Sequence, residues 1–397
     1  LLFTSGTSGA PKAVITSHQR LGAVAVSMKS ILALTPDDTT YICMPLFHSN
    51  ALFTAWGPSL VNGTCIALRR KFSASEFLSD VRKFGATYFN YVGKPLAYIL
   101  ATPEQGDDSD NPLQRGFGNE GSEMDLERFA KRFGCKLTDG YGQTEGGVSI
   151  VRVPGMPQGS LGISPQGGIT VRSPNTGEEC PPAEFDGDGR LLNAEEATGE
   201  IVNSGRGTFE GYWNNVEANN ERIRNGAYWT GDLGYRDANG FFFFAGRSAD
   251  WMRVDGENFA GAPIERIVMR HPDVILAAVY GVPDPEIGDR VMVALQLAPG
   301  SQWDAVEFAA FLGEQTDLGP KWVPTFVHIV EQLPLTQTNK VIKRELVLRR
   351  WHDVEKNENA QVWWRAGKEI RFERFTKSDA DALRAKFERS NRGSILI

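Results

Sequence analysis

The chain has 397 residues and a formal net charge of −7 at pH 7, and this length predicts two or three domains of about 150 residues each. Hydrophobic residues make up 41% and charged residues 23%, which is ordinary for a globular protein with a large core. The acidic balance argues against a protein that binds nucleic acid mainly through positive charge. The sequence contains no uninterrupted run of about 18 apolar residues, which a membrane span would need.

The cysteines and histidines exclude two further classes of protein. Cys43, Cys65, Cys135 and Cys180 lie far apart and form no C-x-x-C pair, which argues against a disulfide framework or a zinc cluster. The five histidines contain no H-E-x-x-H pattern. Scattered cysteines fit a reducing, cytoplasmic compartment, and contact with a membrane surface stays open.

The first part of the chain reads as a mostly parallel sheet with helices. Leu1-Leu2-Phe3 predicts the end of a buried strand, so we expect further sequence upstream. Strands are predicted at residues 13–16, 40–44, 64–68, 86–91 and 136–141. Helices are predicted at residues 21–32, 51–61, 72–84 and 124–133. The last helix follows a Ser122-x-x-Asp125 start signal, and the acidic stretch 102–112 predicts a surface loop.

The texture changes after about residue 154, where Gly, Pro and Asn become frequent and an antiparallel β region is predicted. Its strands are expected at residues 169–172, 200–203 and 241–245. A small α+β unit follows, with strands at 251–254, 274–281, 291–297 and 326–330 and helices at 263–270 and 303–312. Beyond Trp351 the sequence predicts a polar peripheral tail with a final helix near 380–387.

The first candidate site is Thr4-Ser5-Gly6-Thr7-Ser8-Gly9-Ala10-Pro11-Lys12. Hydroxyls and unobstructed backbone N–H groups in such a loop can surround phosphate oxygens, and a lysine adds positive charge. The Walker A pattern is not met. The alternative is a flexible Ser/Gly linker, which seldom lies between two apolar strands.

Two further motifs carry polar side chains next to turns. In Asp139-Gly140-Tyr141-Gly142-Gln143-Thr144-Glu145, an aromatic ring can stack on a base, a threonine can hold a phosphate and a glutamate can bind Mg²⁺. In Tyr228-Trp229-Thr230-Gly231-Asp232, a buried carboxylate can accept hydrogen bonds from two ribose hydroxyls. Taken alone, each also fits an ordinary strand end and turn.

Three further segments follow these motifs: Gly246-Arg247, Arg253-x-x-Gly256-Glu257-Asn258 and the lysine loop at 333–343. All the segments together have a specific order and spacing. In this order the chain resembles, from Leu1 to about residue 346, the adenylate-forming superfamily of acyl-CoA synthetases, nonribosomal-peptide adenylation domains and firefly luciferase. Tyr91-Val92-Gly93, Gly118-Asn119 and the 253–258 motif look like the fatty-acid transport protein branch. That branch comprises very-long-chain and bile-acid-type acyl-CoA synthetases.

The resemblance implies a mixed α/β fold with a large N-terminal domain and a small, mobile α+β C-terminal domain. The large domain would contain mostly parallel sheets with helices and an antiparallel β region. We expect residues 1–248 to bind AMP and the acyl group, with the N-terminal part of the family fold missing from this sequence. Residues 249–350 would form the small domain, and residues 351–397 an extension packed on it.

The resemblance also implies an ATP site assembled from the motifs. Its phosphate-binding residues would be Thr4, Ser5, Gly6, Thr7, Ser8, Gly9 and Lys12. Gly118, Asn119 and Tyr141 would line the adenine slot, and Asp232 and Arg247 would lie at the ribose. Thr144 would contact the α-phosphate, Glu145 would bind Mg²⁺, and Lys340 would bridge the reacting carboxylate and the α-phosphate.

His48 matches a gate beside the acyl pocket, and a packed surface histidine is the alternative interpretation. After the first step the small domain would rotate about a hinge at Ala249 and bring Gly256 to the thiol of coenzyme A. Ala249 replaces the usual Asp or Lys, and Asn339 replaces the glycine that often precedes the lysine. Asn tolerates positive φ, so the turn can be kept.

The resemblance therefore predicts an ATP-, Mg²⁺- and CoA-dependent ligase for a long-chain, very-long-chain or steroid-type carboxylic acid. An acyl-AMP ligase that loads a carrier protein is the nearest rival, and a lipid-uptake protein with weak catalysis is a rival of another class. No nucleic-acid partner is expected. The oligomeric state stays open, with a dimer as one option.

Overall fold

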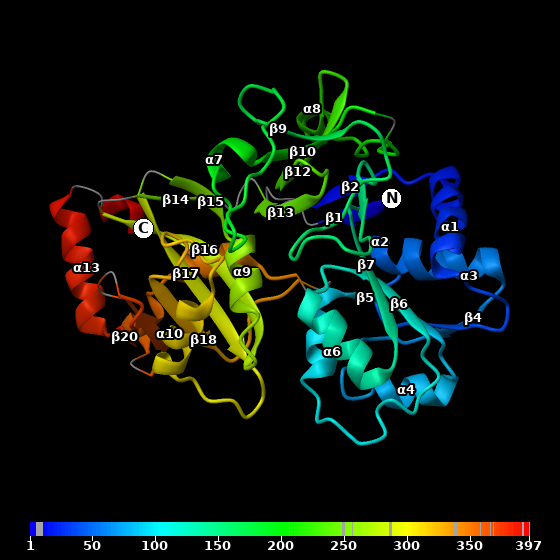
Figure 1. The fold of residues 1–397 in the computed structure, drawn as a ribbon, viewed down its shortest axis with the longest axis horizontal. Coiled ribbons are helices and arrows are strands. Elements are labelled where there is room, and N and C mark those ends of the chain that lie inside the picture. Colours follow the sequence, from blue (N-terminus) through cyan, green and yellow to red (C-terminus); the bar gives the residue numbers. More distant parts are fainter. Residues whose placement is uncertain are drawn as a thin grey trace. The chain divides into compact units, whose positions relative to one another are not determined.

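A computed structural model describes residues 1–4, 11–205, 207–247, 251–255, 257–285, 288–336, 340–357, 359–365, 367, 369–390 and 393–396, with the side chains of residues 247, 257, 258 and 394 left out. The chain divides into two compact units (Figure 1). The first unit comprises Leu1–Thr170, Ile201–Gly231 and Gly240–Phe243. The second comprises Val171–Glu200, Asp232–Asn239 and Phe244–Ile397.

The main sheet of the first unit has the strand order β4-β3-β5-β6-β7-β8. Its strands are β3 (Thr39–Ile42), β4 (Cys65–Leu68), β5 (Tyr88–Val92), β6 (Arg115–Asn119), β7 (Lys136–Gly142) and β8 (Ser149–Val151). All neighbours are parallel except the antiparallel pair β7 and β8. The predicted, mostly parallel sheet is confirmed, although β6 lacks the apolar run that would have predicted it.

The helices of this unit include all four that the sequence predicts. They are α1 (His18–Leu32), α2 (Ser49–Ala51), the π-helical segment η1 (Leu52–Trp56), α3 (Gly57–Asn62), α4 (Phe77–Phe84), α5 (Gly93–Leu100), α6 (Glu123–Phe133) and α8 (Val216–Arg222). The predicted helix at 51–61 is therefore three consecutive segments. Ser122 caps α6 by accepting from the backbone N–H of Asp125, which confirms the start signal.

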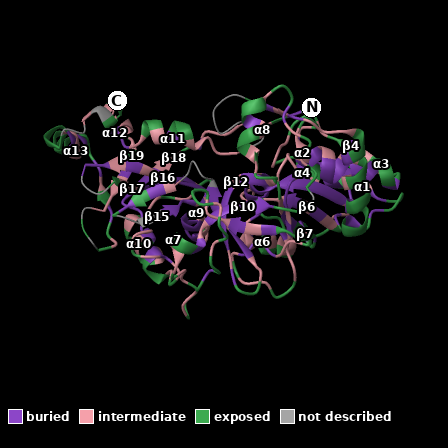
Figure 2. Ribbon diagram, turned by 90° about the horizontal axis from the view of Figure 1, so that it is seen from above, coloured by how far each residue is buried: buried purple, intermediate pink, exposed green. Residues whose placement is uncertain are grey.

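The strands of the main sheet are largely buried (Figure 2), and a cluster of apolar side chains packs on each face. On one face Phe77, Phe89, Phe129 and Phe133 pack ring against ring, with centroids 4.5–6.2 Å apart. The other face, which carries Tyr88, packs against residues of α1 and of the helix that begins at Ser49. Each fully buried aromatic side chain contributes about 1.5–3 kcal/mol to folding, so these layers hold the carboxyl ends of the strands in place.

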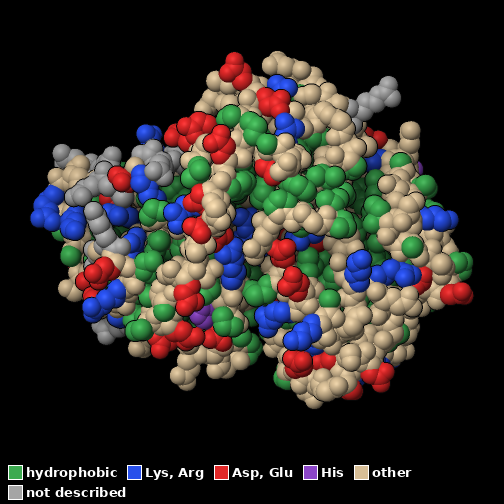
Figure 3. Space-filling view, in the orientation of Figure 1, with side chains coloured by type: hydrophobic (Ala, Val, Ile, Leu, Met, Phe, Trp, Pro, Cys, Tyr) green, Lys and Arg blue, Asp and Glu red, His purple; other side chains and the backbone are tan. Residues whose placement is uncertain are grey.

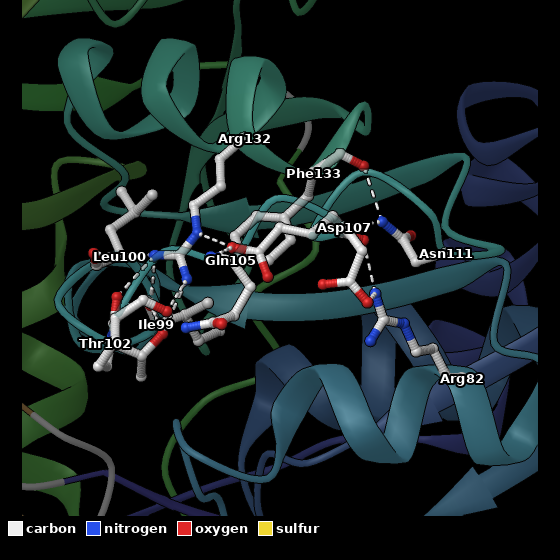
Figure 4. A network of polar contacts seen from close by, with 11 residues as sticks. Arg82, Ile99, Leu100, Thr102, Gln105, Asp107, Asn111, Arg132 and Phe133 are labelled. Carbon is white, nitrogen blue, oxygen red and sulfur yellow. Dashed lines mark hydrogen bonds and ion pairs between the residues drawn. The ribbon is translucent and has the colours of Figure 1, made fainter.

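The acidic stretch 102–112 is a surface loop that one arginine ties to the helix above it (Figure 4). Arg132 of α6 pairs with the buried Asp108 through an Nε–Oδ2 contact of 2.6 Å. Its other nitrogens donate to the carbonyls of Leu100, Thr102 and Pro103. Arg82 of α4 holds the same loop from the other side, through the backbone of Asp107 and Asp110. The predicted loop is confirmed and is anchored by charge-assisted hydrogen bonds.

The first residues form a strand, as the sequence predicts, but the strand is only partly buried. Strand β1 (Leu2–Thr4) pairs antiparallel with β2 (Lys12–Val14). Leu2 and Val14 point into the core, whereas Phe3 is 67% exposed. The expectation of a fully buried apolar triplet is therefore wrong, because alternate residues of a paired strand face opposite sides.

The predicted β region forms a sheet with the order β11-β12-β10-β9, in which β13 also pairs with β12 and the pair β11 and β12 is antiparallel. Its strands are β9 (Ile169–Arg172), β10 (Gly199–Asn203), β11 (Ile223–Arg224), β12 (Ala227–Arg236) and β13 (Phe242–Arg247). Strand β12 contains the whole Tyr228–Asp232 motif. The motif is thus extended strand with a left-handed residue at Gly231 (φ 71°), rather than a turn between elements.

The second unit contains a sheet with the order β15-β14-β17-β18-β19-β20, with β16 beside β17. Its strands are β14 (Trp251–Val254), β15 (Glu257–Ala260), β16 (Val274–Asp284), β17 (Gly288–Leu297), β18 (Phe326–Val330), β19 (Gln361–Trp364) and β20 (Glu373–Arg374). Its helices are α7 (Ala194–Ala197), α9 (Ala262–Val268), α10 (Ala305–Glu314), α11 (Lys343–Arg349), α12 (Asp353–Lys356), α13 (Lys377–Arg389) and the short η3 (Gly393–Leu396).

The residues after Trp351 are more than the peripheral tail that the sequence predicts. Strand β19 pairs antiparallel with β18 and so extends the sheet, and the Trp351 side chain is fully buried. Helix α13 carries basic side chains on its outer surface, which gather at the left edge of Figure 3. The domain boundaries at residues 248 and 350 stay predictions. Within the described residues, no helix combines the length and the hydropathy needed to cross a bilayer.

Candidate functional site

The predicted site residues divide between the two units. The first unit holds Thr4, Lys12, His48, Gly118, Asn119, Tyr141, Thr144 and Glu145, and the second holds Asp232, Arg247 and Lys340. Ser5, Gly6, Thr7, Ser8, Gly9, the hinge residue Ala249, Gly256 and Asn339 lie outside the described residues. The geometry below joins the residues of the first unit, and those of the second are described by themselves.

Tyr212 connects two predicted site residues from distant motifs. Its hydroxyl donates to Oε1 of Glu145 at 2.7 Å, and the Nζ of Lys12 lies 5.5 Å from the centroid of its ring. Burial and the nearby Glu145 charge raise the pKa of Tyr212, so the hydroxyl stays protonated and can donate. Lys12 also pairs with the exposed carboxylate of Glu221 at 3.2 Å. Sequence reasoning missed Tyr212 because it lies outside every motif.

Two arginines that the sequence did not single out lie around Glu145. The buried Arg20 of α1 donates from Nη2 to the carbonyl of Thr144 at 2.5 Å, and it packs so closely on Gly146 that a Cβ there would collide with the guanidinium. Burial lowers the pKa of Arg20, with Glu210 and Glu145 opposing the shift. For Arg222, burial alone would lower the pKa, but Tyr212, Tyr228 and Glu145 outweigh it and raise it.

The turn between Tyr141 and Glu145 is held by hydrogen bonds to β12 on one side and to the start of α2 on the other. Gln143 accepts from the Tyr228 hydroxyl at 2.8 Å and donates to the carbonyl of Thr230 at 3.0 Å. The D-G-Y-G-Q-T-E and Y-W-T-G-D motifs are therefore in direct contact. On the other side, the Thr144 and Ser49 hydroxyl oxygens lie 2.8 Å apart, which links the turn to the start of α2.

The predicted adenine slot lies where β6 and β7 end side by side. Asn119 donates to the carbonyl of Gly140 at 2.6 Å, and it accepts from the amide of Asn50 at 2.9 Å. A Cβ at Gly118 would overlap the ring and carbonyl of Tyr91, so only glycine allows β5 and β6 to pack this closely. Tyr141 is half-buried on β7, opposite Ile150 of β8.

Asp139 is a buried carboxylate two residues before Tyr141. Its Oδ2 accepts from the backbone N–H of Gly121 at 2.9 Å and from the Tyr91 hydroxyl at 3.2 Å. Burial raises the pKa of Asp139 to about 7, against an ordinary value of 3.8, although the Gly121 hydrogen bond and the Arg152 charge oppose the shift. Perturbed carboxylates of this kind often occur at functional sites, and the composition of the motif gave no sign of the burial.

His48 caps the start of α2. Its Nδ1 accepts from the backbone N–H of Asn50 at 3.3 Å, so a neutral imidazole would carry its proton on Nε2. The side chain is half-buried. This bond fixes the ring next to Asn50, which contacts the predicted adenine-slot residue Asn119, and the gate role stays a prediction.

The second unit holds the remaining predicted residues that the structure describes. Asp232 is buried on β12 next to Gly231, and Arg247 is the last residue of β13. The half-buried Lys340 is held by its backbone, whose N–H donates to the hydroxyl of Thr336 at 3.0 Å and whose carbonyl accepts from the Thr336 N–H at 2.8 Å. Lys343, three residues further on, pairs with Glu265 at 2.9 Å.

The arrangement in the first unit combines cationic and acidic side chains. Tyr212 contacts both Lys12 and Glu145, and the charges of Arg20 and Arg222 act on the same region. Two further carboxylates lie beside the cations, Glu221 at Lys12 and Glu210 near Arg20. Threonine and asparagine side chains of the same unit offer neutral donors and acceptors. Such a set can hold a multiply charged anion and orient a planar group next to it.

The chain belongs to the AMP-binding enzyme family: residues 1–213 match the AMP-binding enzyme domain, and residues 263–340 match the AMP-binding enzyme C-terminal domain. One relative is the medium/long-chain-fatty-acid–CoA ligase FadD17 of Mycobacterium marinum, which is 53% identical over 87% of this chain and 66% of its own length. The steroid-22-oyl-CoA synthetase of Rhodococcus jostii is 52% identical over 88% of this chain and 63% of its own length. The chain thus spans less than two thirds of these relatives.

Solved structures agree with this assignment. ATP-bound MatB from Rhodopseudomonas palustris has a TM-score of 0.73 and 25% identity, with 87% of this chain and 67% of that chain covered. The mixed α/β fold and the place in the adenylate-forming superfamily are therefore confirmed. The narrower branch is supported in part, because the long-chain fatty acid transport protein 5 of Mus musculus is 31% identical over 87% of this chain and 52% of its own length.

Proposed function

We propose that the protein is an ATP-, Mg²⁺- and CoA-dependent acyl-CoA ligase for a fatty or steroid-type carboxylic acid. The observation that carries the proposal is the gathering of Lys12, Asn119, Thr144 and Glu145, from three separate motifs, around Tyr212, Ser49 and Asn50. The relatives at 52–54% identity are named as ligases that couple medium- or long-chain fatty acids, or a steroid acid, to CoA.

In the first step a carboxylate oxygen attacks the α-phosphorus of ATP, and pyrophosphate leaves. Both reactants are anions that repel each other, so cations must lie around the reacting atoms. Lys12 and Arg20 supply fixed positive charge, and the Thr144 hydroxyl can donate to an α-phosphate oxygen. Lys12 would exchange its exposed partner Glu221 for the phosphates, since surface ion pairs contribute only about 0–1 kcal/mol.

The residues present fit one Mg²⁺ ion bound together with phosphates. Proteins often hold Mg²⁺ with one or two carboxylates plus substrate phosphates. Glu145 is a single carboxylate that Tyr212 orients, and no group of three or more His, Cys, Asp or Glu in the described part of the chain has metal-binding geometry. Glu145 would hold the ion, which when bound would neutralise charge on the triphosphate.

In the second step the thiol of CoA attacks the acyl carbon, and AMP leaves with the carboxylate oxygen it received. Lys340 would act in the first step only. Rotation of residues 249–350 about Ala249 would then withdraw Lys340 and bring Gly256 to the thiol. We also propose that the protein can contact a membrane surface peripherally and can form a dimer.

The test is an acid panel with ATP, Mg²⁺ and an acceptor thiol. Medium-chain, very-long-chain and steroid side-chain acids are each supplied with CoA or with a phosphopantetheine-loaded carrier protein, and pyrophosphate and thioester are measured. Acid-dependent pyrophosphate with a CoA thioester supports the proposal. Thioester on the carrier protein alone would favour the acyl-AMP ligase, and the absence of acid-dependent pyrophosphate would contradict both.

A further inference from the structure

Ser49 and Asn50, at the start of α2, belong to none of the motifs that predicted the site. Nevertheless their side chains contact residues of the predicted base slot and of the predicted phosphate turn. Asn50 is buried, with 5% of its surface exposed, so its amide must find its hydrogen bonds within the protein.

The Asn50 amide bridges two neighbouring strands of the main sheet. Its Nδ2 donates to the carbonyl of Tyr91 at 3.0 Å and to Oδ1 of Asn119 at 2.9 Å, while its Oδ1 accepts from Nδ2 of Asn90 at 2.6 Å. Because the Tyr91 carbonyl can only accept, the orientation of the Asn50 amide is fixed. Asn119, held in this way, donates onward to the carbonyl of Gly140.

The backbone around Asn50 is fixed as tightly as its side chain. The following segment, η1, has a π-helical turn, a feature frequent at functional sites. The Thr54 hydroxyl donates to the carbonyl of Asn50 at 2.7 Å, and the Tyr88 hydroxyl donates to the carbonyl of Thr54 at 2.5 Å. On the other side, the backbone N–H of Asn50 donates to Nδ1 of His48. Asn50 therefore has little freedom to move independently.

Ser49 makes the second connection. Its hydroxyl lies 2.8 Å from the hydroxyl of Thr144, so one of the two donates to the other. A single dipeptide thus contacts both Asn119, on the base side, and Thr144, on the phosphate side.

From this geometry we propose that Asn50 and Ser49 are positioning residues for the nucleotide: Asn50 orients Asn119 and the carbonyl of Gly140, and Ser49 orients the Thr144 hydroxyl. The inference rests on the proposed function, because it assigns the nucleotide to these residues. The bonds come from the start of one helix, so the helix couples the two halves of the slot and fixes His48 beside them.

The experiment compares Asn50→Ala and Ser49→Ala with a matched control, Asn62→Ala. Asn62 is a buried asparagine of the consecutive segment α3, and its amide donates to the carbonyl of Pro58 within that segment. For each variant we measure the KM for ATP, the KM for the acid, direct binding of a fluorescent ATP analogue, and the melting temperature. Asn50→Ala is also combined with Asn119→Ala in a double-mutant cycle.

We expect Asn50→Ala to raise the KM for ATP about fivefold or more, since each hydrogen bond contributes about 1 kcal/mol, with the KM for the acid nearly unchanged. Adding Asn50→Ala to Asn119→Ala should weaken analogue binding less than it does in the parent. Ser49→Ala, which removes a hydroxyl at a half-buried position, should lower kcat for pyrophosphate release while its melting temperature stays that of the parent.

The outcomes separate the two proposals. Suppose that the parent protein is active. If Asn50→Ala then has the same ATP affinity as Asn62→Ala, or if the effects of Asn50→Ala and Asn119→Ala are additive, only the positioning role is overturned. If Asn50→Ala does not fold, an unchanged kcat in Ser49→Ala overturns the coupling. A parent protein that neither binds the ATP analogue nor releases pyrophosphate overturns the proposed function and this inference with it.

Discussion

Replacing Asp139 with Asn should abolish a large pH dependence of stability. The carboxylate is 7% exposed at the end of β7, and burial raises its pKa to about 7, whereas the ordinary value is 3.8. The folded protein therefore binds this proton more tightly than the unfolded chain does. Stability from this group is fully present below about pH 4 and is lost as the pH rises through 7.

The magnitude follows from the two pKa values. One pKa unit corresponds to about 1.36 kcal/mol, so the free energy of unfolding should fall by about 2–3 kcal/mol between pH 5 and pH 8 on account of Asp139 alone. Asparagine cannot ionise, and its Oδ1 can still accept from Gly121 and Tyr91. Asp139→Asn should therefore be more stable than the parent at pH 8 and lose most of that advantage at pH 5.

Urea unfolding at pH 5, 6.5 and 8 measures this difference. Asp108 provides a matched control with the opposite sign, because its pKa is lowered: burial would raise it, but the Gln105 N–H and Arg132 outweigh burial. Asp108→Asn should thus destabilise the protein equally at pH 5, 6.5 and 8, and the loss should shrink only below pH 4, which a further measurement at pH 3 tests. If Asp139→Asn keeps the parent's dependence on pH between 5 and 8, the carboxylate does not titrate in this range and the reasoning fails.

Three further predictions concern the chemistry. Glu145→Ala should depress pyrophosphate release. Added Mg²⁺ should restore the rate only in part, because the variant lacks the carboxylate that Tyr212 orients and so loses the geometry of the metal site as well as its charge; a Mg²⁺ titration measures this. Asp232→Ala should raise the KM for ATP by about tenfold or more, since hydrogen bonds to a charged group contribute roughly 1.5–3 kcal/mol; kinetics with ATP and 2′-deoxy-ATP measure it. Lys340→Ala should slow acyl-adenylate formation by about 10²–10³ and leave thioester formation from synthetic acyl-adenylate close to normal.

Each of these has its own control. Tyr212→Phe keeps Glu145 and removes only its hydrogen bond, so it should show a milder Mg²⁺ defect, and an unchanged rate in Glu145→Ala would remove that residue from the metal site. Replacing ATP with 2′-deoxy-ATP should raise the KM less in Asp232→Ala than in the parent. Equal increases in both proteins would exclude contact between Asp232 and the ribose. Lys343 is unsuitable as a control because it pairs with Glu265; the exposed Lys356 serves instead. Equal losses in both half-reactions of Lys340→Ala would contradict its restriction to the first step.

The sequence predicted the regular parts of the fold because hydrophobic periodicity determines them. Residues 169–172, 251–254 and 326–330 were predicted as strands with the bounds that the structure has. Strand β6 was missed because Gly116 and Gly118 interrupt its apolar pattern. A Cβ at Gly116 would lie 2.7 Å from both Phe89 and Leu137, so packing rather than propensity requires glycine there.

The motifs located the candidate site, but they could not identify the residues that hold it together. Tyr212 lies 67 residues from Glu145, and Asn50 lies 69 residues from Asn119. Such contacts depend on which strand ends meet, and a single sequence carries no local pattern for them. Arg20 follows the same rule: a charged residue within α1 reads as a solvated side chain until the fold buries it.

The transfer of a carboxylate oxygen to AMP is the most direct test of the account. The acid is labelled with ¹⁸O in its carboxylate and incubated with the protein, ATP, Mg²⁺ and CoA, and the nucleotide and phosphate products are analysed by mass spectrometry. If the carboxylate attacks the α-phosphorus, one ¹⁸O atom must appear in AMP for each CoA thioester formed, and pyrophosphate must carry none. Label in inorganic phosphate together with ADP, or thioester formed without label in AMP, would contradict the proposed acyl-adenylate chemistry.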